Sequence, residues 1–342
     1  FKQFIEKAGI PTAWTIMGMS GIPTDHPLAV GMLGMHGNYG PNVLTNECDV
    51  LIAIGMRFDD RVTGRLDKYA KQAKVIHLDI DPSEIDKNVK TTVPVWGDCK
   101  ETLPMLTELI QQKTHTAWLN KFREYQKKED EKCINPELNP VTDELTMGEV
   151  INLLNELTKG EAVIVTDVGQ HQMVACRYAK YNKSKSNITS GGLGTMGFAL
   201  PTAIGAKYGA PDRTIIAIAG DGGIQMTIQE LGTIMQFKTD VKIIILNNQF
   251  LGMVRQWQQL FHEKRYSFVD ITSPDFVQVA KGYYIDGQKV SERSKLKGAL
   301  ATMLNYKGSY LLEIMVGKEN NVFPMVPQGR GVSEIILSKE EL

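Results

Sequence analysis

Short apolar runs alternate with polar or amphipathic stretches along most of the chain, a pattern that predicts alternating strands and helices. In the first third, Val50–Ile54, Lys74–Asp79 and Val93–Trp96 have the length of strands, and Glu101–Gln112 has helical periodicity. In the second half, helical patterns such as Met147–Thr158 separate four further strand-length runs. These later runs are almost entirely apolar, which is typical of parallel strands covered on both faces, and they span Ala162–Thr166, Thr214–Ala219, Val241–Leu246 and Tyr310–Val316.

This alternation predicts an α/β fold with two doubly wound parallel-sheet domains. The length of 342 residues is sufficient for two domains. We expect residues 1–112 to form a Rossmann-like central domain and residues 148–342 to form a second domain with a C-terminal tail. Residues 113–147 combine a run of mixed charges with a turn-rich stretch, which favours a linker that contains an exposed helix. Asp81 followed by Pro82 predicts a capped helix start.

Composition excludes several classes of function. Lys+Arg total 38 against 39 for Asp+Glu, so neither nucleic acid nor an anionic membrane is an expected partner. The apolar runs are far shorter than the roughly 18 residues that a membrane span needs. The 4 cysteines lack a zinc-binding spacing, which favours free thiols in a reducing compartment. The sequence begins within a helical pattern and without a Met, so we expect it to be part of a longer protein.

Two polar clusters follow two neighbouring predicted strands. The first is GDGG at 220–223, the second is the pair Asn247 and Asn248, and a helix predicted over Ile224–Phe237 joins them. The number of residues between Gly222 and Asn247 is 24. Because the carboxyl ends of parallel strands meet at one edge of a sheet, where open α/β sheets bind ligands, we expect the two clusters to lie close together.

The residue types in these clusters suit a metal ion and a diphosphate. Asp221 supplies an anionic oxygen and Asn248 a neutral amide oxygen, both of which are ligands for Mg²⁺. Gly222 and Gly223 carry no Cβ, so the backbone can approach a phosphate at the start of the following helix. Each cluster alone also fits an ordinary tight turn, but the two together at this spacing predict a metal-diphosphate site.

The GDG and NN clusters resemble the thiamine-diphosphate motif of the superfamily that includes pyruvate decarboxylase and acetolactate synthase. Longer runs extend the resemblance to the large, catalytic subunit family of acetohydroxyacid synthase, also called acetolactate synthase. In the second domain these runs are VTDVGQHQM (165–173), TSGGLGTMGFALP (189–201), GDGGIQMTIQEL (220–231) and ILNNQFLGMVRQWQ (245–258). In the first domain, GMLGMHG (31–37) and GMRFDDRVTG (55–64) resemble the FAD-binding central domain of that family.

The resemblance implies positions for two cofactors in the second domain. Asp221, Asn248 and the backbone carbonyl of Phe250 would ligate Mg²⁺. Met196 would hold thiamine diphosphate in its bent form, although core packing explains a Met at this position equally well. The residues implied at thiamine diphosphate are Val168, Gly169, Gln170, His171, Gly194, Met196, Asp221, Gly222, Gly223, Asn248, Gly252 and Met253.

The resemblance also implies a substrate pocket and a flavin site. Arg61 would pair with a substrate carboxylate, and Trp257 would shape the pocket with Met253 and Val254; without the resemblance, Arg61 reads as a surface cation and Trp257 as a helix core residue. Asp79 has independent support, because an acidic residue after the second strand of a nucleotide fold binds a ribose hydroxyl. The residues implied at FAD are Thr15, Ile16, Leu33, Gly34, Met35, His36, Gly55, Arg57, Asp59, Arg61, Val62, Asp79 and Asp98.

The implied activity is decarboxylation of pyruvate on thiamine diphosphate and ligation of the two-carbon unit to a second 2-keto acid, pyruvate or 2-oxobutyrate. This is the first common step of branched-chain amino-acid synthesis, and FAD has no redox role in it. The implied catalytic glutamate lies in an N-terminal domain, so we expect no catalytic residue in this sequence and no activity from it alone.

The resemblance further implies a homodimer or homotetramer of catalytic subunits and a small regulatory subunit. We expect a cytoplasmic protein of bacterial type, with an organellar location also open. Two alternative functions stay open from the residues themselves. One is another thiamine-diphosphate-dependent 2-keto acid decarboxylase or oxidase, and the other is a non-catalytic nucleotide-binding module.

Overall fold

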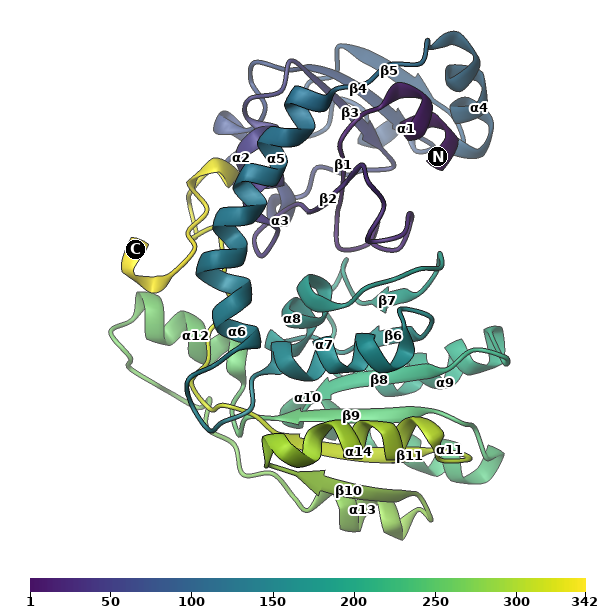
Figure 1. Ribbon diagram of the computed structural model, residues 1–342, viewed down its shortest axis with the longest axis vertical. Helices are drawn as coiled ribbons and strands as arrows, with labels where there is room; N and C mark the ends of the chain where they lie inside the picture. The colour runs from purple at the N-terminus through teal and green to yellow at the C-terminus, as the bar shows by residue number, and fades with distance from the viewer. The chain divides into compact units, whose positions relative to one another are not determined.

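The computed structural model describes residues 1–342, and the chain divides into two compact units (Figure 1). Unit 1 comprises Phe1–Gly18, His26–Ile134 and Phe323–Leu342. Unit 2 comprises Met19–Asp25 and Asn135–Val322. The chain therefore passes between the units several times, and each unit is described by itself below.

Unit 1 contains two small parallel sheets. Strand β1 pairs with β2, and strands β3, β4 and β5 form a second sheet in that order. The three strands predicted from the sequence match β3, β4 and β5, whereas β1 and β2 are too short to give a periodic signal. The strands are β1 (Thr12–Trp14), β2 (Ala29–Met32), β3 (Val50–Ile54), β4 (Lys74–Asp79) and β5 (Val93–Trp96).

The helices of unit 1 surround a core in which Phe58 meets Tyr69 and His77 edge to face. Val332, near the end of the chain, belongs to this same core. Asp81 caps the short helix η2 by accepting a hydrogen bond from Ser83 N, as its sequence predicts. The helices are α1 (Lys2–Ala8), α2 (Tyr39–Thr45), α3 (Asp60–Thr63), η1 (Leu66–Lys68), η2 (Pro82–Glu84), α4 (Cys99–Leu109), α5 (Thr116–Glu129), η3 (Asp130–Ile134), η5 (Val332–Glu334) and η6 (Lys339–Glu341).

Unit 2 is built on a parallel sheet of 6 strands in the order β10-β11-β9-β8-β6-β7. The four central strands are those predicted from the sequence, each within one residue of its expected ends, and every residue of β6, β8 and β9 is buried. The edge strands β7 and β10 were not predicted, because they carry polar residues and lack an apolar run. The strands are β6 (Val163–Thr166), β7 (Asn187–Thr189), β8 (Ile215–Gly220), β9 (Lys242–Asn247), β10 (Asp286–Val290) and β11 (Tyr310–Met315).

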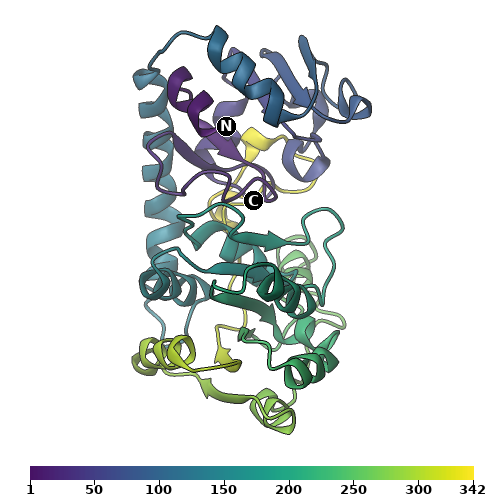
Figure 2. The same ribbon diagram turned by 90° about the vertical axis from the view of Figure 1, so that its right-hand side faces the viewer.

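Helices cover both faces of this sheet, which gives unit 2 three layers (Figure 1 and Figure 2). Helices α9, α11 and α13 pack on one face around Leu200, Leu231 and Phe276, and α7, α8 and α14 pack on the other. The helices are α6 (Asn135–Leu138), α7 (Met147–Thr158), α8 (Gln170–Tyr178), α9 (Ala199–Gly209), α10 (Asp221–Gln225), η4 (Ile228–Glu230), α11 (Leu231–Phe237), α12 (Gly252–Phe261), α13 (Phe276–Gly282) and α14 (Arg293–Asn305).

The helix predicted over Ile224–Phe237 is wrong as one continuous element. It is divided into α10, η4 and α11, with a break at Met226 and Thr227. The Thr227 hydroxyl donates to Gly197 O at 2.8 Å, and a side chain that bonds to distant backbone in this way competes with helix continuation. The helix that begins at Asp221 is therefore a single short turn, and its dipole contributes less to a phosphate site than the expected long helix would.

The segment expected to be a linker is mostly helical and packed. Helix α5 lies against α2 in unit 1, and its Glu129 is 1% exposed, although the charge run predicts a solvated face. The Glu129 carboxylate accepts hydrogen bonds from Tyr39 N at 2.6 Å and Asn38 Nδ2 at 2.9 Å. The compact units also differ from the expected ranges at the chain end, because residues 323–342 belong to unit 1. Val326 N donates to Met35 O at 2.7 Å, which joins this tail to the loop after β2.

None of the helices has both the length and the apolar character that crossing a lipid bilayer requires.

Candidate metal and diphosphate site

Three neighbouring parallel strands of unit 2 end at the same edge of the sheet. The last residues of β6, β8 and β9 are Thr166, Gly220 and Asn247, and β8 lies between the other two strands. The residues predicted to bind Mg²⁺ and diphosphate follow directly after these strand ends. The structure therefore brings together the two clusters that the sequence singled out, as the strand pattern predicts.

Asp221 is a buried carboxylate at this edge, with 1% of its surface exposed. Its Oδ2 accepts a hydrogen bond from Ser273 Oγ at 2.8 Å, while its Oδ1 has no hydrogen-bond partner. Burial raises the pKa of Asp221 to about 6, and nearby backbone groups of Gly222 and Gln249 act in the opposite direction. A buried carboxylate oxygen without a partner is costly in the ligand-free protein, and a divalent cation would relieve that cost.

Asn248 lies beside this carboxylate at the end of β9 and is 4% exposed. Its Oδ1 accepts from Phe250 N at 3.2 Å, and its Nδ2 donates to Gln170 Oε1 at 3.3 Å. Gln249, between Asn248 and Phe250, has a φ of 56°. Leu251 N, just after this turn, donates to Val269 O at 2.8 Å and so ties the end of the turn to a neighbouring loop. No three His, Cys, Asp or Glu side chains come together as a metal cluster in the chain. A metal held by Asp221 and Asn248 would bind one carboxylate oxygen and one amide oxygen.

Asp167 joins the end of β6 to two other segments of the site. Its Oδ1 accepts from Val168 N at 2.7 Å and from Gly197 N at 2.9 Å, just before α9. Burial raises the pKa of Asp167, and these backbone hydrogen bonds act in the opposite direction. A Cβ on Gly223 would lie 3.0 Å from the Asp167 Cγ, and one on Gly222 would lie 2.8 Å from Leu251 Cδ2. A side chain at either position would therefore crowd a neighbouring side chain, and the crowding at Gly223 would fall on the buried Asp167.

His171 is buried at the start of α8, close to the end of β8. Desolvation lowers its pKa to about 4, and a hydrogen bond to the Asp167 backbone acts against this shift, so the imidazole is neutral at pH 7. Its Nε2 has no hydrogen-bond partner. The adjacent Gly169 has a φ of 154°, and Val168 is half-buried. This segment offers backbone N–H groups at the strand edge, which suit an anionic oxygen, beside an imidazole that carries no positive charge.

Gly194 and Met196 lie in the loop between β7 and α9. Gly194 has a φ of 62° with open space around it, and Met196 is half-buried. Leu193 in the same loop is 93% exposed. Met196 is therefore only partly buried, which is compatible both with packing against its neighbours and with contact to a ligand.

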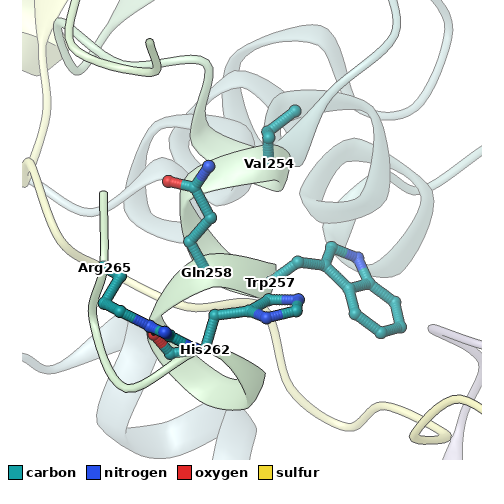
Figure 3. A pocket seen from close by; sticks show the side chains of 5 residues that line it. All are labelled: Val254, Trp257, Gln258, His262 and Arg265. Atoms are coloured by element: carbon teal, nitrogen blue, oxygen red, sulfur yellow. The ribbon is translucent and has the colours of Figure 1, made fainter. Parts of the chain in front are cut away.

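A pocket of about 530 Å³ lies along α12, as Figure 3 shows. Trp257 is half-buried, and its ring lies 4.8 Å from that of Phe261 between ring centroids. The preceding Arg255 and Gln256 are fully buried and bond to the segment Glu319–Val322, which anchors the helix. Met253 is half-buried and Gly252 begins the helix, and the pocket itself is lined by Val254, Trp257, Gln258, His262 and Arg265.

In unit 1, the residues implied at FAD lie at or after the carboxyl ends of its parallel strands. They follow all five strands of the unit, which is the edge where α/β sheets bind nucleotides. Met35 N donates to Arg61 O at 2.8 Å, which brings the loop after β2 to α3. Asn42 exchanges hydrogen bonds with the backbone of Gly34 at 3.0 and 2.9 Å, and His36 is 4% exposed with its Nδ1 3.3 Å from Pro324 O.

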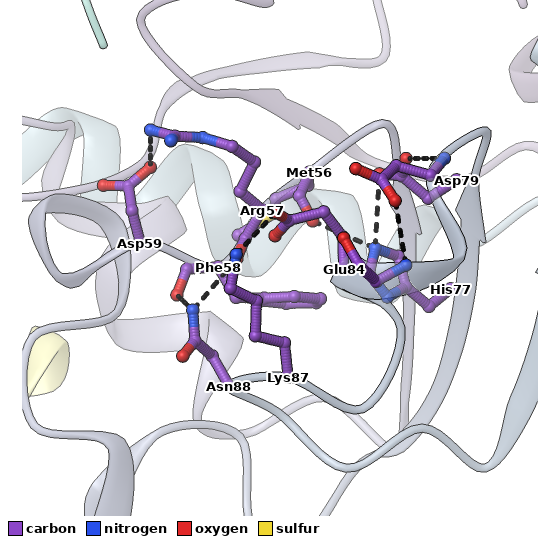
Figure 4. A network of polar contacts seen from close by, with 11 residues as sticks. Met56, Arg57, Phe58, Asp59, His77, Asp79, Glu84, Lys87 and Asn88 are labelled. Carbon is purple, nitrogen blue, oxygen red and sulfur yellow. Dashed lines mark hydrogen bonds and ion pairs between the residues drawn. The ribbon is translucent and has the colours of Figure 1, made fainter. Parts of the chain in front are cut away.

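The remaining unit 1 positions vary in burial. Asp79 is 7% exposed and accepts from Asp81 N at 2.9 Å, and His77 Nε2 lies 2.9 Å from Met56 O (Figure 4). Asp59 and Asp98 act as helix caps for α3 and α4. Thr15, Ile16 and Leu33 are half-buried, Val62 is buried, and Gly55, Arg57 and Arg61 are exposed. Arg61 belongs to unit 1 and the other substrate-pocket residues belong to unit 2, so the structure describes these two parts of the predicted pocket separately.

Two family models match the chain. Residues 167–314 match the C-terminal TPP binding domain of thiamine pyrophosphate enzymes, and residues 1–106 match the central domain of the same enzymes. Together the two matches cover most of the chain. The chain belongs to the thiamine pyrophosphate enzymes. The strand-edge cluster of Asp221 and Asn248 lies inside the matched TPP binding domain of this family.

Among the thiamine pyrophosphate enzymes, the chain is similar to acetolactate synthases along nearly its whole length. It is 40% identical over 336 residues to the acetolactate synthase isozyme 2 large subunit of Escherichia coli K12, covering 98% of this chain and 60% of that protein. It is 41% identical over 353 residues to acetolactate synthase 1, chloroplastic, of Oryza sativa subsp. japonica, covering 98% of this chain and 54% of that protein. The chain thus spans just over half the length of these relatives.

Two residues of the candidate site were not singled out from the sequence. Asp167 follows a buried strand in the way that Asp221 does, so the rule that found Asp221 also points to it. Ser273 lies in a loop 52 positions from the carboxylate that it contacts, and no local pattern marks it. Only the three-dimensional structure places the Ser273 hydroxyl at this site.

Proposed function

We propose that this chain binds Mg²⁺ and the diphosphate of thiamine diphosphate at the carboxyl edge of the unit 2 sheet. The observation that carries the proposal is Asp221, a buried carboxylate with one unpartnered oxygen that follows β8, while Asn248 follows the adjacent strand β9. These donors fit Mg²⁺, because it prefers hard oxygen ligands and keeps open positions for phosphate oxygens. The backbone carbonyl of Phe250 would be the third protein ligand, and the backbone of Val168 to His171 would face the diphosphate.

We further propose that the complete protein is an acetolactate synthase. Its first substrate would be pyruvate, and its second would be either pyruvate or 2-oxobutyrate. Thiamine diphosphate supplies the electron sink for decarboxylation and carbon–carbon bond formation. The residues of this chain would bind and orient it: Asp221 and Asn248 through the metal, and Met196 beside its rings. In unit 2, Trp257 would form an apolar wall of a pocket for the second keto acid. In unit 1, Arg61 would pair with a substrate carboxylate.

FAD is proposed as a second cofactor, held by unit 1. The support is the position of Asp79 at the end of β4 and the loop of Leu33 to His36 at the end of β2, both at strand ends where nucleotides bind. The glutamate that the resemblance requires for activating thiamine diphosphate is proposed to come from outside these 342 residues, so the chain alone would not turn over pyruvate. A homo-oligomer with a small regulatory subunit is proposed as the assembly.

The test is product analysis with protein expressed from the complete reading frame and supplied with pyruvate, thiamine diphosphate, Mg²⁺ and FAD. We expect acetolactate, and we expect it to be lost in Asp221→Asn, because the amide removes the anionic ligand. Asp212→Asn is a matched control, since Asp212 is an exposed carboxylate in the loop before β8.

The possible products separate the candidate functions. Acetaldehyde, or acetate with peroxide, would keep the cofactor assignment and make the protein another decarboxylase or oxidase. No product together with no Mg²⁺-dependent binding of thiamine diphosphate by calorimetry would contradict both the activity and the metal site. A full loss of activity in Asp212→Asn as well would show that the Asp221 effect is not specific.

A further inference from the structure

A fully buried carboxylate lies within the unit 2 sheet, one strand away from the proposed metal ligands. Glu313 stands in β11, whose sequence YLLEIM is otherwise apolar, and none of its surface is exposed. A buried ionised carboxylate destabilises a fold unless its partners compensate for the lost hydration. An apolar residue would suit this strand better for packing alone, so the partners of Glu313 indicate what the carboxylate does.

Both partners of Glu313 come from the neighbouring strands and bond to the same oxygen. Its Oε1 accepts a hydrogen bond from Asn247 Nδ2 at 2.8 Å and lies 3.0 Å from Lys289 Nζ. Lys289 is directly opposite Glu313 in the pairing of β10 with β11, and its side chain is half-exposed. Asn247 is the last residue of β9 and is buried, so one end of the Glu313 network leads directly to the edge of the sheet where the proposed metal ligands lie.

Asn247 connects Glu313 to the turn that carries the metal ligands. While its Nδ2 donates to Glu313, its Oδ1 accepts from Gln249 N at 3.0 Å. A carboxylate can only accept hydrogen bonds, so Glu313 determines which end of the amide faces it and directs the amide oxygen to Gln249. That bond helps hold Gln249 at a φ of 56°, which a non-glycine residue adopts only when its surroundings enforce it.

We propose that Glu313 is a positioning residue for the metal site: it orients the Asn247 amide and thereby fixes the turn 247–250 that presents Asn248 and the Phe250 carbonyl. This accounts for the first asparagine of the NN pair, which the metal site itself does not use. The statement about Mg²⁺ rests on the proposed function, whereas the statement about the turn can be tested without any ligand.

Two variants that reverse the hydrogen bond between residues 247 and 313 can distinguish a positioning role of Glu313 from a role in packing alone. Asn247→Asp keeps an acceptor for Gln249 N but removes the donor to Glu313 and places two carboxylates in contact. Adding Glu313→Gln supplies a donor from the other side and restores a hydrogen bond of opposite direction. Asp286→Asn is the control, because Asp286 is an exposed carboxylate at the amino end of β10, away from the site edge.

The first measurement is amide hydrogen exchange by NMR in the ligand-free chain. We expect the Gln249 amide to exchange about tenfold faster in Asn247→Asp than in the wild type and to recover in the double variant. A purely structural role would instead accelerate exchange throughout β9, β10 and β11. Equal Gln249 exchange in all variants, or no recovery in the double variant, would overturn the proposal.

The second measurement is a Mg²⁺ titration in the presence of thiamine diphosphate, followed by calorimetry on protein from the complete reading frame. We expect affinity for Mg²⁺ to fall about 10- to 100-fold in Asn247→Asp and to recover largely in the double variant. Equal weakening in both variants would overturn the proposal. If the wild type does not bind while the exchange pattern holds, the proposed function fails and the positioning of the turn by Glu313 stands.

Discussion

At the scale of single residues, the buried charge of Asp221 destabilises the ligand-free protein. Asp221 is buried, one of its oxygens lacks a partner, and its pKa is raised to about 6 by desolvation. Asp221→Asn should therefore raise the free energy of unfolding of the ligand-free protein by about 1–3 kcal/mol at pH 7, because the charge is removed and an oxygen stays available to Ser273. Urea denaturation in the presence of EDTA measures this, with Asp212→Asn as the control. A less stable Asp221→Asn protein would contradict this explanation.

The burial of Trp257 bears on whether this residue packs in the core or lines a pocket. It is half-buried, stacks on Phe261 and lines the α12 pocket. Trp257→Ala should therefore cost about 1–2 kcal/mol of unfolding free energy, less than the roughly 3–5 kcal/mol of a core tryptophan. Chemical denaturation checks this, and Phe276→Ala in the buried core of the same unit is the comparison. A loss as large as that of Phe276→Ala would show that Trp257 is part of the core.

At the scale of elements, α7 depends on a reciprocal cap at its first turn. Thr146 Oγ1 accepts from Glu149 N at 3.1 Å, and Glu149 Oε2 accepts from Thr146 N at 2.9 Å. Thr146→Ala should lower the free energy of unfolding by about 1 kcal/mol, because it removes the acceptor of the Glu149 N–H. Thr158→Ala, at the other end of α7, removes only a hydroxyl that donates to Leu154 O and should cost less. Equal losses in thermal unfolding would refute the role of the cap.

The short helix α6 adds a pH-dependent contact to the same turn. Glu137 Oε1 accepts from Gly148 N at 2.9 Å, and burial raises its pKa from 4.5 to about 6. Between these values the native state binds more protons than the unfolded state, so stability falls as pH rises from 4.5 to 6. Glu137→Gln lacks this loss and should be more stable than the wild type by up to about 2 kcal/mol above pH 6, with little difference below pH 4.5. Denaturation curves at pH 4 and pH 7 measure the difference, which should not appear in Glu144→Gln, an exposed carboxylate nearby.

The elements found from the sequence are those whose chemistry is local. Strands such as Val50–Ile54 and helix Met147–Thr158 agree with the structure because one face or both are apolar over their full length. Edge strand β10 (DGQKV) is polar, and β1 has only 3 residues, so neither carries such a pattern. The break at Thr227 was missed because its cause, a hydrogen bond to Gly197, lies 30 positions away in sequence.

The same distinction holds for the site. Asp221 and Asn248 could be found because strand ends and residue types are written in the sequence. Ser273 and Glu313 could not, since their roles depend on contacts across 52 and 66 positions of the chain. Their partners are determined by the order of strands in the sheet, which no local pattern reveals.

At the scale of the whole molecule, unit 1 depends on the last residues of the chain. Met325 is fully buried and pairs with Ile336, and Cys133 Sγ contacts Leu337 O at 3.1 Å. Removal of residues 323–342 should therefore destabilise unit 1 by several kcal/mol, because a buried apolar segment is lost, and should leave unit 2 folded. Hydrogen exchange measured by mass spectrometry tests this. Faster exchange in β3 and β4 with unchanged β8 and β9 is expected, and uniform change across both units would contradict it.

The interleaving of the two units has a consequence for how the protein is made. Unit 2 is complete once Val322 has been synthesised, although its strands come later in the chain than those of unit 1. Unit 1, whose strands precede those of unit 2 in the sequence, acquires its final core residues only from residues 323–342. The sheets of unit 1 therefore cannot complete their core until residues 323–342 have left the ribosome, and until then their unfinished surface is open to chaperones and proteases.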